Sequence, residues 1–442
     1  MANRSTWASQ IGFILSSVGA AVGLGAIWKF PYLAGSNGGS AFFLPYLVLT
    51  FTVGVVLLIA EITLGRVAKG SIVPAYRTLG GKGFLPFAYM GIVTGFLVMS
   101  FYSAVGGWTI AYFFEALAGS GIVADKASLG AHFAGLVSNP VSALGLQALF
   151  LALTALVVCR DVSAGIERLN KVLLPLFLAL MVVVIIRGVT LPGAMKGVSY
   201  LFSFDAGRFT AASLFQAMGF MFFSLCVGCG CMLAYGSYLS ERVNVVRSCF
   251  WITFLSLLAS VLGGLMVMPA VFAFGLDPAA GPGLTFVTMP IVFAQLPFGS
   301  FFAALFYLCL IFAALTSAVS LMEIIVSWCV DELRVTRGRA TIYVSFALML
   351  TGSLCSLSFG PLSGTKVFGK TFFDLADFLS SNIGLPVGGL VLCAVAGFFA
   401  WPQVKDVLLR SGLSKTAASV FRFILTVASP AVILIVLVGG LV

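Results

Sequence analysis

Long apolar runs dominate the chain, separated by short segments that contain charges, glycine or proline. About 20 apolar residues are enough to cross the hydrocarbon core of a bilayer as an α-helix. We therefore expect eleven membrane-spanning helices, which predict an all-α polytopic membrane protein with a single transmembrane domain over residues 1–442. Their approximate ranges are 8–34, 39–66, 84–118, 141–159, 165–189, 209–238, 246–275, 295–331, 337–357, 371–400 and 415–441.

The composition agrees with this pattern. Hydrophobic residues make up 61% of the chain and charged residues 9%, whereas soluble domains carry roughly 25% charged residues. Soluble enzyme classes are therefore excluded, and no nucleophile–base constellation indicates an enzyme. The net charge of +10 does not indicate nucleic acid, because the basic residues fall at the ends of apolar runs. The nine cysteines lie mostly inside those runs, which is typical of buried hydrophobic residues rather than disulfides.

The distribution of Lys and Arg predicts the orientation. If the N-terminus is cytoplasmic, 17 of the 24 Lys and Arg residues fall in cytoplasmic segments. The remaining seven are Lys29, Lys126, Arg187, Lys196, Arg208, Lys366 and Lys370. Since cytoplasmic loops carry the excess of positive charge, we expect a cytoplasmic N-terminus and an external C-terminus.

Two of the apolar runs are rich in glycine at mid-membrane depth. The first contains GAAVGLG at 19–25, followed by Pro31, and the sixth contains FFSLCVGCG at 222–230. Glycine weakens a helix, and lipid cannot satisfy a broken backbone, so such breaks persist only where they line a cavity inside the protein. Close packing of small residues between helices is the alternative explanation. The breaks fall at matching positions in two five-helix halves, 8–189 and 209–400, with 415–441 as an extra helix. This symmetry favours a 5+5 inverted repeat and a transporter.

The order of these motifs resembles the neurotransmitter:sodium symporter family. The matching stretches are residues 7–31, NGGSAF at 37–42, GIER at 165–168, residues 222–230 with YGSY at 235–238, and residues 315–333. They span nearly the whole chain. The resemblance implies a bacterial transporter, located in the inner membrane, that imports an amino acid together with sodium.

The resemblance also implies the substrate site. The N–H groups of Leu24 and Gly25 and the Tyr102 hydroxyl would hold the substrate carboxylate at a half-helix N-terminus. Monoamine transporters of the family carry aspartate where this chain has Gly23, so the substrate is expected to keep its own carboxylate. Carbonyl groups near Ala21, Phe223, Ser224 and Cys226 would receive the ammonium, and Val98, Tyr102, Phe223, Cys226, Cys229, Ser317 and Leu321 would line the side-chain pocket.

This expected pocket is mostly apolar and predicts a hydrophobic L-amino acid. Cys229 replaces the phenylalanine of the leucine-type member, which favours large aliphatic or aromatic side chains. A zinc site is not expected, because the lone His132 lies in a predicted external loop.

One sodium site of the family maps fully onto this chain. Its ligands would be the carbonyl oxygens of Gly19, Val22 and Ala313 and the hydroxyls of Thr316 and Ser317. Hard cations prefer several such oxygen ligands. The other family site would use Ala21, Ser224 and two asparagines, which are Ala26 and Ser256 in this chain. Alanine offers no side-chain oxygen, so we expect this second site to be weak or absent, with one coupled sodium.

A chloride site is only partly represented. Ser260 and Tyr46 match chloride-type positions of the family, but Phe220 occupies the place of the expected glutamine. The residues therefore do not predict a complete chloride site.

The family resemblance implies two gates. Lys29 and Asp377 would form the external gate, and Arg4 and Asp331 the cytoplasmic one, supported by Trp7, Ser237 and Tyr238. The family usually has arginine in place of Lys29, and lysine lacks its bidentate fork. Snorkelling interfacial charges are the alternative reading of these residues.

The sequence predicts a sodium-coupled symporter for a hydrophobic amino acid that works by alternating access. An uncoupled amino acid binding or sensing protein and a proton-coupled transporter remain open at this point. The sequence does not fix the oligomeric state.

Overall fold

The computed structural model describes residues 6–120, 126–279 and 283–441. The first five spans are α1 (Gln10–Leu24) with η1 (Gly25–Lys29) and α2 (Phe30–Ser36); α3 (Ser40–Leu49) with η2 (Thr50–Gly54) and α4 (Val55–Ala68); α6 (Leu85–Ala118); α8 (Pro140–Val158); and η4 (Ser163–Glu167) with α9 (Arg168–Val189).

The remaining spans follow in the same manner. They are α11 (Ala211–Leu225) with α12 (Cys231–Ser237); α13 (Val245–Ala273); α15 (Gly299–Glu332); α16 (Arg337–Leu357); α17 (Phe372–Asp377) with η7 (Phe378–Gly384), α18 (Leu385–Ala394) and η8 (Val395–Phe399); and α20 (Lys415–Phe423) with η9 (Ile424–Ala428) and α21 (Ser429–Leu441).

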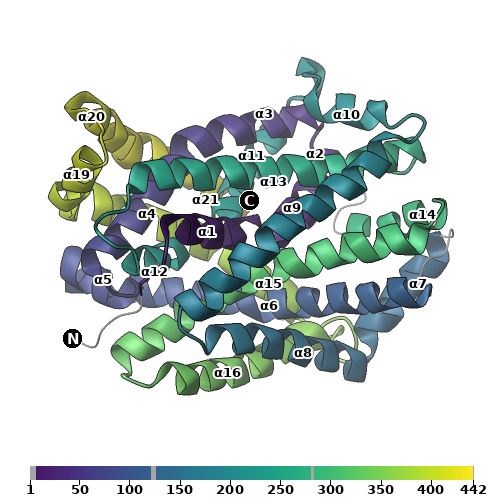
Figure 1. Cartoon of the computed structure of the whole chain (residues 1–442), viewed down its shortest axis with the longest axis horizontal. Coiled ribbons are helices and arrows are strands. Elements are labelled where there is room, and N and C mark those ends of the chain that lie inside the picture. The colour runs from purple at the N-terminus through teal and green to yellow at the C-terminus, as the bar shows by residue number, and fades with distance from the viewer. Residues whose placement is uncertain (1–5, 121–125, 280–282, 442) are drawn as a thin grey trace.

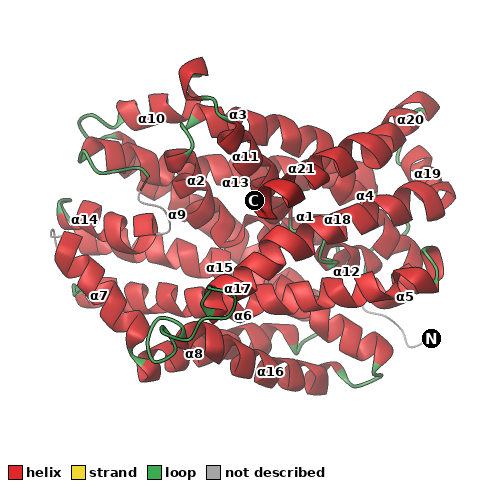
Figure 2. Ribbon diagram, turned by 180° about the vertical axis from the view of Figure 1, so that it is seen from behind, coloured by secondary structure: helices red, strands yellow, loops and turns green. Residues whose placement is uncertain are grey.

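The predicted fold class is confirmed. In the described ranges, ten continuous helical spans are long and apolar enough to cross a membrane, and the broken pair α11–α12 lies where the sixth of the eleven helices was expected. The only β feature of these ranges is an isolated bridge between Val367 and Lys370, and Figure 2 shows helices joined by loops. The division into two repeats stays a prediction.

The long helices run side by side along the long axis of the molecule (Figure 1). In the middle of the bundle, α6 packs along α15, and α1 packs against α15 and α13. Local sequence sets the ends of these helices. A proline lies in the first turn of α6, where its missing N–H costs nothing, and Gly119 ends the helix with φ 69°.

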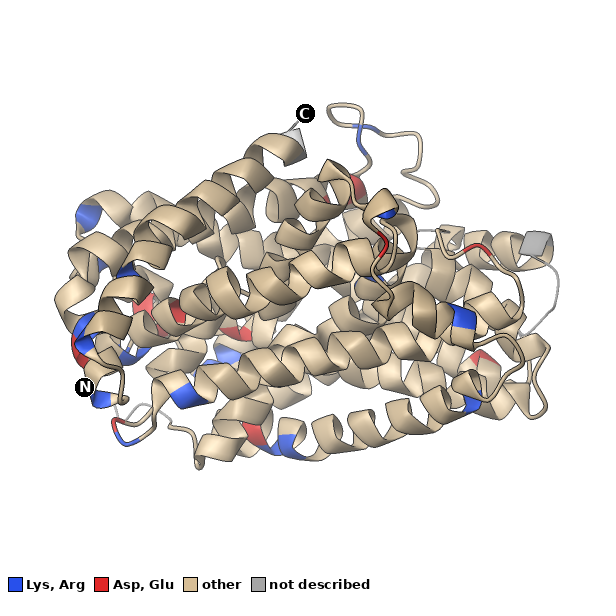
Figure 3. Ribbon diagram, turned by 90° about the horizontal axis from the view of Figure 1, so that it is seen from above, with Lys and Arg blue, Asp and Glu red and all other residues tan. Residues whose placement is uncertain are grey.

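Several short helices in the connections were not predicted: α5 (Ile72–Leu79), η3 (Lys82–Phe84), α7 (Lys126–Ser138), α10 (Met195–Phe202), η5 (Ala206–Arg208), η6 (Leu284–Thr288) with α14 (Met289–Ala294), and α19 (Trp401–Arg410). They lie near the two ends of the bundle, α5 and α19 at one end and α7, α10 and α14 at the other (Figure 1). Lys and Arg gather at the end that holds the start of the chain (Figure 3). This asymmetry agrees with the predicted orientation, which itself stays a prediction.

Candidate functional site

The first helix is interrupted at a single glycine. Gly23 has φ 29° and ψ −163° inside an otherwise helical run. A Cβ atom there would lie 2.4 Å from Ser317 Oγ and 3.0 Å from Tyr102 Oη. Glycine is therefore required both by the backbone conformation and by the close approach of α15 and α6.

The sixth helix is interrupted over several residues. After α11, Cys226 adopts φ 53°, and Gly228 and Gly230 have φ 98° and 84°. The buried carboxylate of Glu61 on α4 accepts a hydrogen bond from the Gly228 N–H at 2.9 Å. On the other side, a Cβ on Gly388 of α18 would lie 1.8 Å from the Gly228 oxygen. The break is thus held between α4 and α18, inside the protein, as the sequence predicts for a mid-membrane break.

A cavity with an empty volume of about 450 Å³ lies where the two breaks meet. Of the predicted substrate residues, it brings together Ala21, Gly25, Val98, Tyr102, Phe223, Cys226, Cys229, Ser317 and Leu321. No Asp, Glu, Lys or Arg of the described chain is among its lining residues.

The remaining two predicted substrate residues, Leu24 and Ser224, do not line the cavity. The Leu24 N–H donates to Tyr102 Oη at 3.0 Å, and the Gly25 N–H donates to the Val22 carbonyl. The amides expected to hold a carboxylate are therefore satisfied internally here. An arriving carboxylate would have to replace these acceptors.

Two of the predicted sodium residues, Gly19 of α1 and Ser317 of α15, lie in contact. Ser317 Oγ donates to the Gly19 carbonyl at 2.9 Å and to the Ala20 carbonyl at 2.9 Å. Thr316 Oγ1 donates to the Ala313 carbonyl at 3.1 Å. Val22 is buried on α1 beyond Gly19. Hydroxyls and carbonyls of two helices are thus concentrated beside the break, and such neutral oxygens suit a hard monovalent cation.

The second predicted sodium set is less complete. Ala21 lines the cavity, and Ala26 and Ser256 are buried. Ser224 Oγ donates to the Met221 carbonyl at 3.1 Å. The alanine at 26 offers only its backbone oxygen.

The chloride-type residues lie next to one another. The Tyr46 hydroxyl donates to Ser224 Oγ at 3.2 Å and lies 3.3 Å from Ser260 Oγ. The Phe220 ring packs on Tyr46 with ring centroids 4.9 Å apart. The apolar Phe220 ring therefore packs beside Tyr46 at the position where the family resemblance led us to expect a glutamine.

A second cavity, which we call the outer cavity, adjoins the cavity at the two breaks, which we call the inner cavity. Lys29, Asp377, Trp28 and Asp374 line the outer cavity, and Tyr102 and Phe223 border both cavities. Lys29 Nζ lies 4.3 Å from the centroid of the Phe223 ring, and Asp377 Oδ1 accepts from Ser381 Oγ at 2.8 Å. Lys29 and Asp377 both lie within the described residues. Among the ion pairs of these residues, none joins Lys29 to Asp377. The external gate stays a prediction.

The cytoplasmic gate cannot be placed in full, because Arg4 lies outside the described residues. Asp331 Oδ2 accepts from the Ser71 N–H at 2.7 Å. Trp7 Nε1 donates to the Tyr235 carbonyl at 2.9 Å, which ties the start of the chain to α12.

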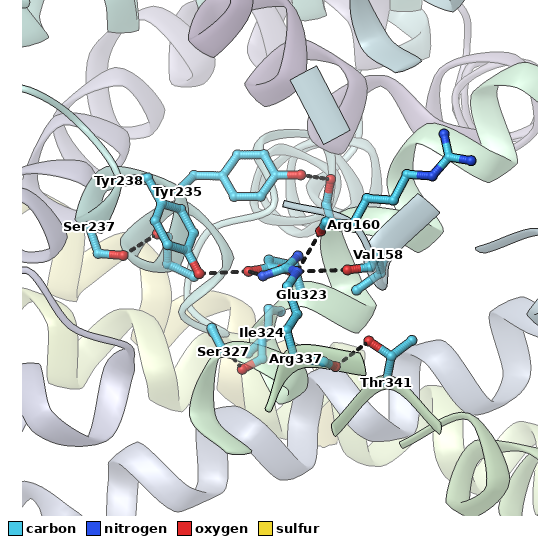
Figure 4. Close-up of polar contacts among 12 residues, drawn as sticks. Val158, Arg160, Tyr235, Ser237, Tyr238, Glu323, Ile324, Ser327, Arg337 and Thr341 are labelled. Atoms are coloured by element: carbon cyan, nitrogen blue, oxygen red, sulfur yellow. Dashed lines mark hydrogen bonds and ion pairs between the residues drawn. The ribbon is translucent and has the colours of Figure 1, made fainter. Parts of the chain in front are cut away.

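A buried ion pair lies close to Tyr235 and Tyr238 (Figure 4). The Arg337 guanidinium pairs with both carboxylate oxygens of Glu323, which is fully buried. The Tyr238 hydroxyl donates to the same carboxylate at 2.7 Å. Arg337 Nε also donates to the carbonyls of Val158 and Arg160, at 2.7 and 2.6 Å. One guanidinium therefore joins α15, α16, the end of α8 and the turn that follows it.

Sequence reasoning missed several of these residues. Leu385 and Ala20 line the inner cavity, but an apolar residue in an apolar helix carries no signal of its own. The pairing of Glu323 with Arg337 was also missed, although a mid-membrane acid needs a partner and Arg337 is a nearby candidate along the chain. Glu167, within the GIER motif, accepts from the Ala8 N–H at 2.7 Å and from Ser9 Oγ at 2.9 Å.

Comparison with known proteins identifies the family. Residues 4–121 and 138–442 match the model of the sodium:neurotransmitter symporter family. The chain is 42% identical over 388 residues to the uncharacterised sodium-dependent transporter YhdH of Bacillus subtilis, covering 87% of this chain and 86% of that one. An uncharacterised sodium-dependent transporter of Haemophilus influenzae is 31% identical over 450 residues, with 99% and 98% covered.

A solved structure shares the whole architecture. The crystal structure of MhsT in complex with L-phenylalanine superposes with a TM-score of 0.91 at 36% identity, covering 99% of this chain and 100% of that one. Family model, curated relatives and fold agree, and this chain therefore belongs to the sodium:neurotransmitter symporter family.

Proposed function

We propose that this protein is a sodium-coupled symporter that imports a hydrophobic L-amino acid by alternating access. The observation that carries the proposal is the meeting of two broken helices, at Gly23 and at Cys226–Gly230, around one cavity at the centre of the bundle. Broken helices expose backbone dipoles, which can bind an anionic group at one half-helix and a cation at another.

The lining of the inner cavity supports the substrate class. Val98, Leu321 and Leu385 give it apolar walls, and the Phe223 ring covers one side. A charged side chain would be buried there without a counter-charge, at a large cost. The similar MhsT was crystallised with L-phenylalanine, which agrees with a cavity for a large apolar side chain.

The substrate carboxylate is assigned to the half-helix that begins after Gly23. It would take the Leu24 N–H and the Tyr102 hydroxyl as donors, in exchange for the hydrogen bond that these two groups now share. The ammonium would bind carbonyl oxygens near Ala21 and Phe223. Ser317 lines the cavity and also contacts α1, so it links the substrate to the ion.

We assign one sodium ion to Gly19, Val22, Ala313, Thr316 and Ser317. Ser317 and Thr316 now donate to carbonyls of this set, and turning these hydroxyls would present their lone pairs to an ion. The set at Ala26 and Ser256 lacks the amide oxygens of the family site, so a second ion is not part of the proposal.

The decisive test is uptake into proteoliposomes that contain the full chain. Radiolabelled phenylalanine, leucine and lysine would be offered with an inward sodium gradient, and with choline in place of sodium at fixed pH. We expect phenylalanine or leucine uptake that needs sodium, with a Hill coefficient near one, and no lysine uptake. Uptake that persists in choline would favour proton coupling. Sodium-dependent binding without uptake would favour a sensor. Either result would overturn the proposal, and a Hill coefficient near two would overturn the single-ion stoichiometry.

A further inference from the structure

A buried amide on α9 has an oxygen without a partner in the described chain. Asn170 is fully buried. Its Nδ2 donates to the Ile166 carbonyl at 2.9 Å, but its Oδ1 has no hydrogen-bond partner within the described ranges. Buried polar atoms are nearly always paired, because an unpaired one loses its hydration without compensation. We therefore expect a bound ligand to satisfy this amide oxygen.

The free oxygen points at the proposed ion-binding residues. A Cβ atom built on Gly19 would lie 1.9 Å from Asn170 Oδ1 and 3.1 Å from Thr316 Cβ. Asn170 Oδ1 thus lies against α1 at a residue whose carbonyl is assigned to the ion, on the side that Thr316 also faces. Only glycine at position 19 leaves room for this approach.

The hydrogen bond of the amide group fixes its orientation. Because the nitrogen donates to the Ile166 carbonyl in the preceding segment η4, the oxygen is the atom directed toward α1. Ser16, one turn before Gly19 on α1, also has a buried hydroxyl without a partner in the described chain, so Ser16 does not satisfy the amide. Amide oxygens are good ligands for hard cations.

We infer that Asn170 Oδ1 is a further oxygen ligand of the sodium ion, bound directly or through one water. This inference rests on the proposed function. It adds a third helix, α9, to a site that the resemblance assigns to α1 and α15 alone. The bound ion would then hold α9 against the break in α1.

The test is a sodium titration of the purified full-length protein, read by thermal stabilisation and by binding of radioactive sodium without amino acid. Asn170→Leu and Asn170→Ala remove the oxygen, and Asn170→Asp keeps an oxygen and adds negative charge. Gln147→Leu is the matched control, because Gln147 is also a fully buried amide, hydrogen-bonded to Ser103 of α6 and Ser356 of α16.

We expect the sodium midpoint of the Leu and Ala variants to rise about tenfold or more, as for losses of supporting groups at metal sites. Asn170→Asp should keep or lower the midpoint, and Gln147→Leu should leave it unchanged. Affinity for the amino acid at saturating sodium should stay within about threefold of wild type.

Sodium midpoints within twofold of wild type in Asn170→Leu and Asn170→Ala would overturn the inference, as would a rise in Asn170→Asp equal to theirs. If Asn170→Leu does not fold, the Ala and Asp variants decide. A wild-type protein that shows no response to sodium would instead overturn the proposed function itself, so the two failures are distinguishable.

Discussion

At the scale of single residues, the site depends on positions where adding or removing one heavy atom changes the contacts around the break in α1. Gly23 and Tyr102 are the clearest examples. The first allows the break in α1, and the second satisfies the N–H group of Leu24 that follows it.

Gly23→Ala should abolish transport. The added methyl group would lie 2.4 Å from Ser317 Oγ, and alanine is strained at φ 29°. We expect uptake to fall by about two orders of magnitude, because even small misplacements at a site can cost that much, while the protein still inserts in the membrane. Proteoliposome uptake is the measurement. Gly145→Ala on α8 is the control, because its Cβ would meet nothing within 4 Å. Wild-type uptake by Gly23→Ala would contradict the role of the break.

Tyr102→Phe should weaken amino acid binding about tenfold, since it removes one hydrogen bond to a charged carboxylate, worth about 1.5–3 kcal/mol. Isothermal titration at saturating sodium would measure the change. Tyr112→Phe is the matched control, because the Tyr112 hydroxyl is buried and has no hydrogen-bond partner within the described residues. Equal losses in the two variants would argue against a specific contact with Tyr102.

Some residues of the candidate site could be predicted from the sequence, and others could not. The glycines at mid-membrane depth predicted both breaks because they fall at matching positions in the two five-helix halves; their presence alone would also fit close helix packing. Leu385 was not predictable, because its place at the cavity follows from the packing of α18 and not from any chemistry of leucine. Asn170 is recognisable in the sequence as a polar residue in an apolar helix. The direction of its oxygen toward Gly19, however, is visible only in three dimensions.

At the scale of elements, the broken helices need support from their neighbours. Glu61 on α4 accepts from the Gly228 N–H, so Glu61→Leu should leave a buried donor unpaired. We expect a loss of about 1–3 kcal/mol of stability and a lower melting temperature in detergent. Glu61→Gln keeps an acceptor oxygen and should melt closer to wild type. The reverse order of the two melting temperatures would show that Glu61 does not act through this hydrogen bond.

The Arg337–Glu323 pair supports α15, α16 and the end of α8, and it is also bonded to Tyr238, directly after α12. Arg337→Met would leave the Glu323 carboxylate buried without its counter-charge, which typically costs about 3–5 kcal/mol. The double variant Arg337→Met, Glu323→Gln should recover part of the loss, because no uncompensated charge remains. Thermal unfolding of the wild type, both single variants and the double variant would form the cycle. Strictly additive losses would contradict a coupled pair.

Element boundaries were largely predictable, because the length of an apolar run fixes the length of a spanning helix. The short connecting helices were not. α5 and α19 are too short and too polar to stand out from a loop, and they form because their apolar faces pack on the ends of longer helices. Ile72 and Val404 are buried in this way.

At the scale of the whole molecule, the predicted orientation can be tested with a natural cysteine. Cys159, directly after α8, is the exposed one among the nine cysteines, and it lies at the predicted cytoplasmic end of the expected helix 141–159. A membrane-impermeant maleimide should label inside-out vesicles and leave intact cells unlabelled. Cys159→Ser should remove the label. Labelling of intact cells at this residue would reverse the assigned orientation.

The neutral wall of the inner cavity has a consequence for energetics. Its described lining includes no Asp, Glu, Lys or Arg, and the two charges of a zwitterion cancel. In the proposed cycle, the membrane voltage would therefore act on the metal ion alone. It would contribute about 2.3 kcal/mol per 100 mV for each ion that crosses, so the number of ions per turnover would set how steeply the cell can concentrate its nutrient.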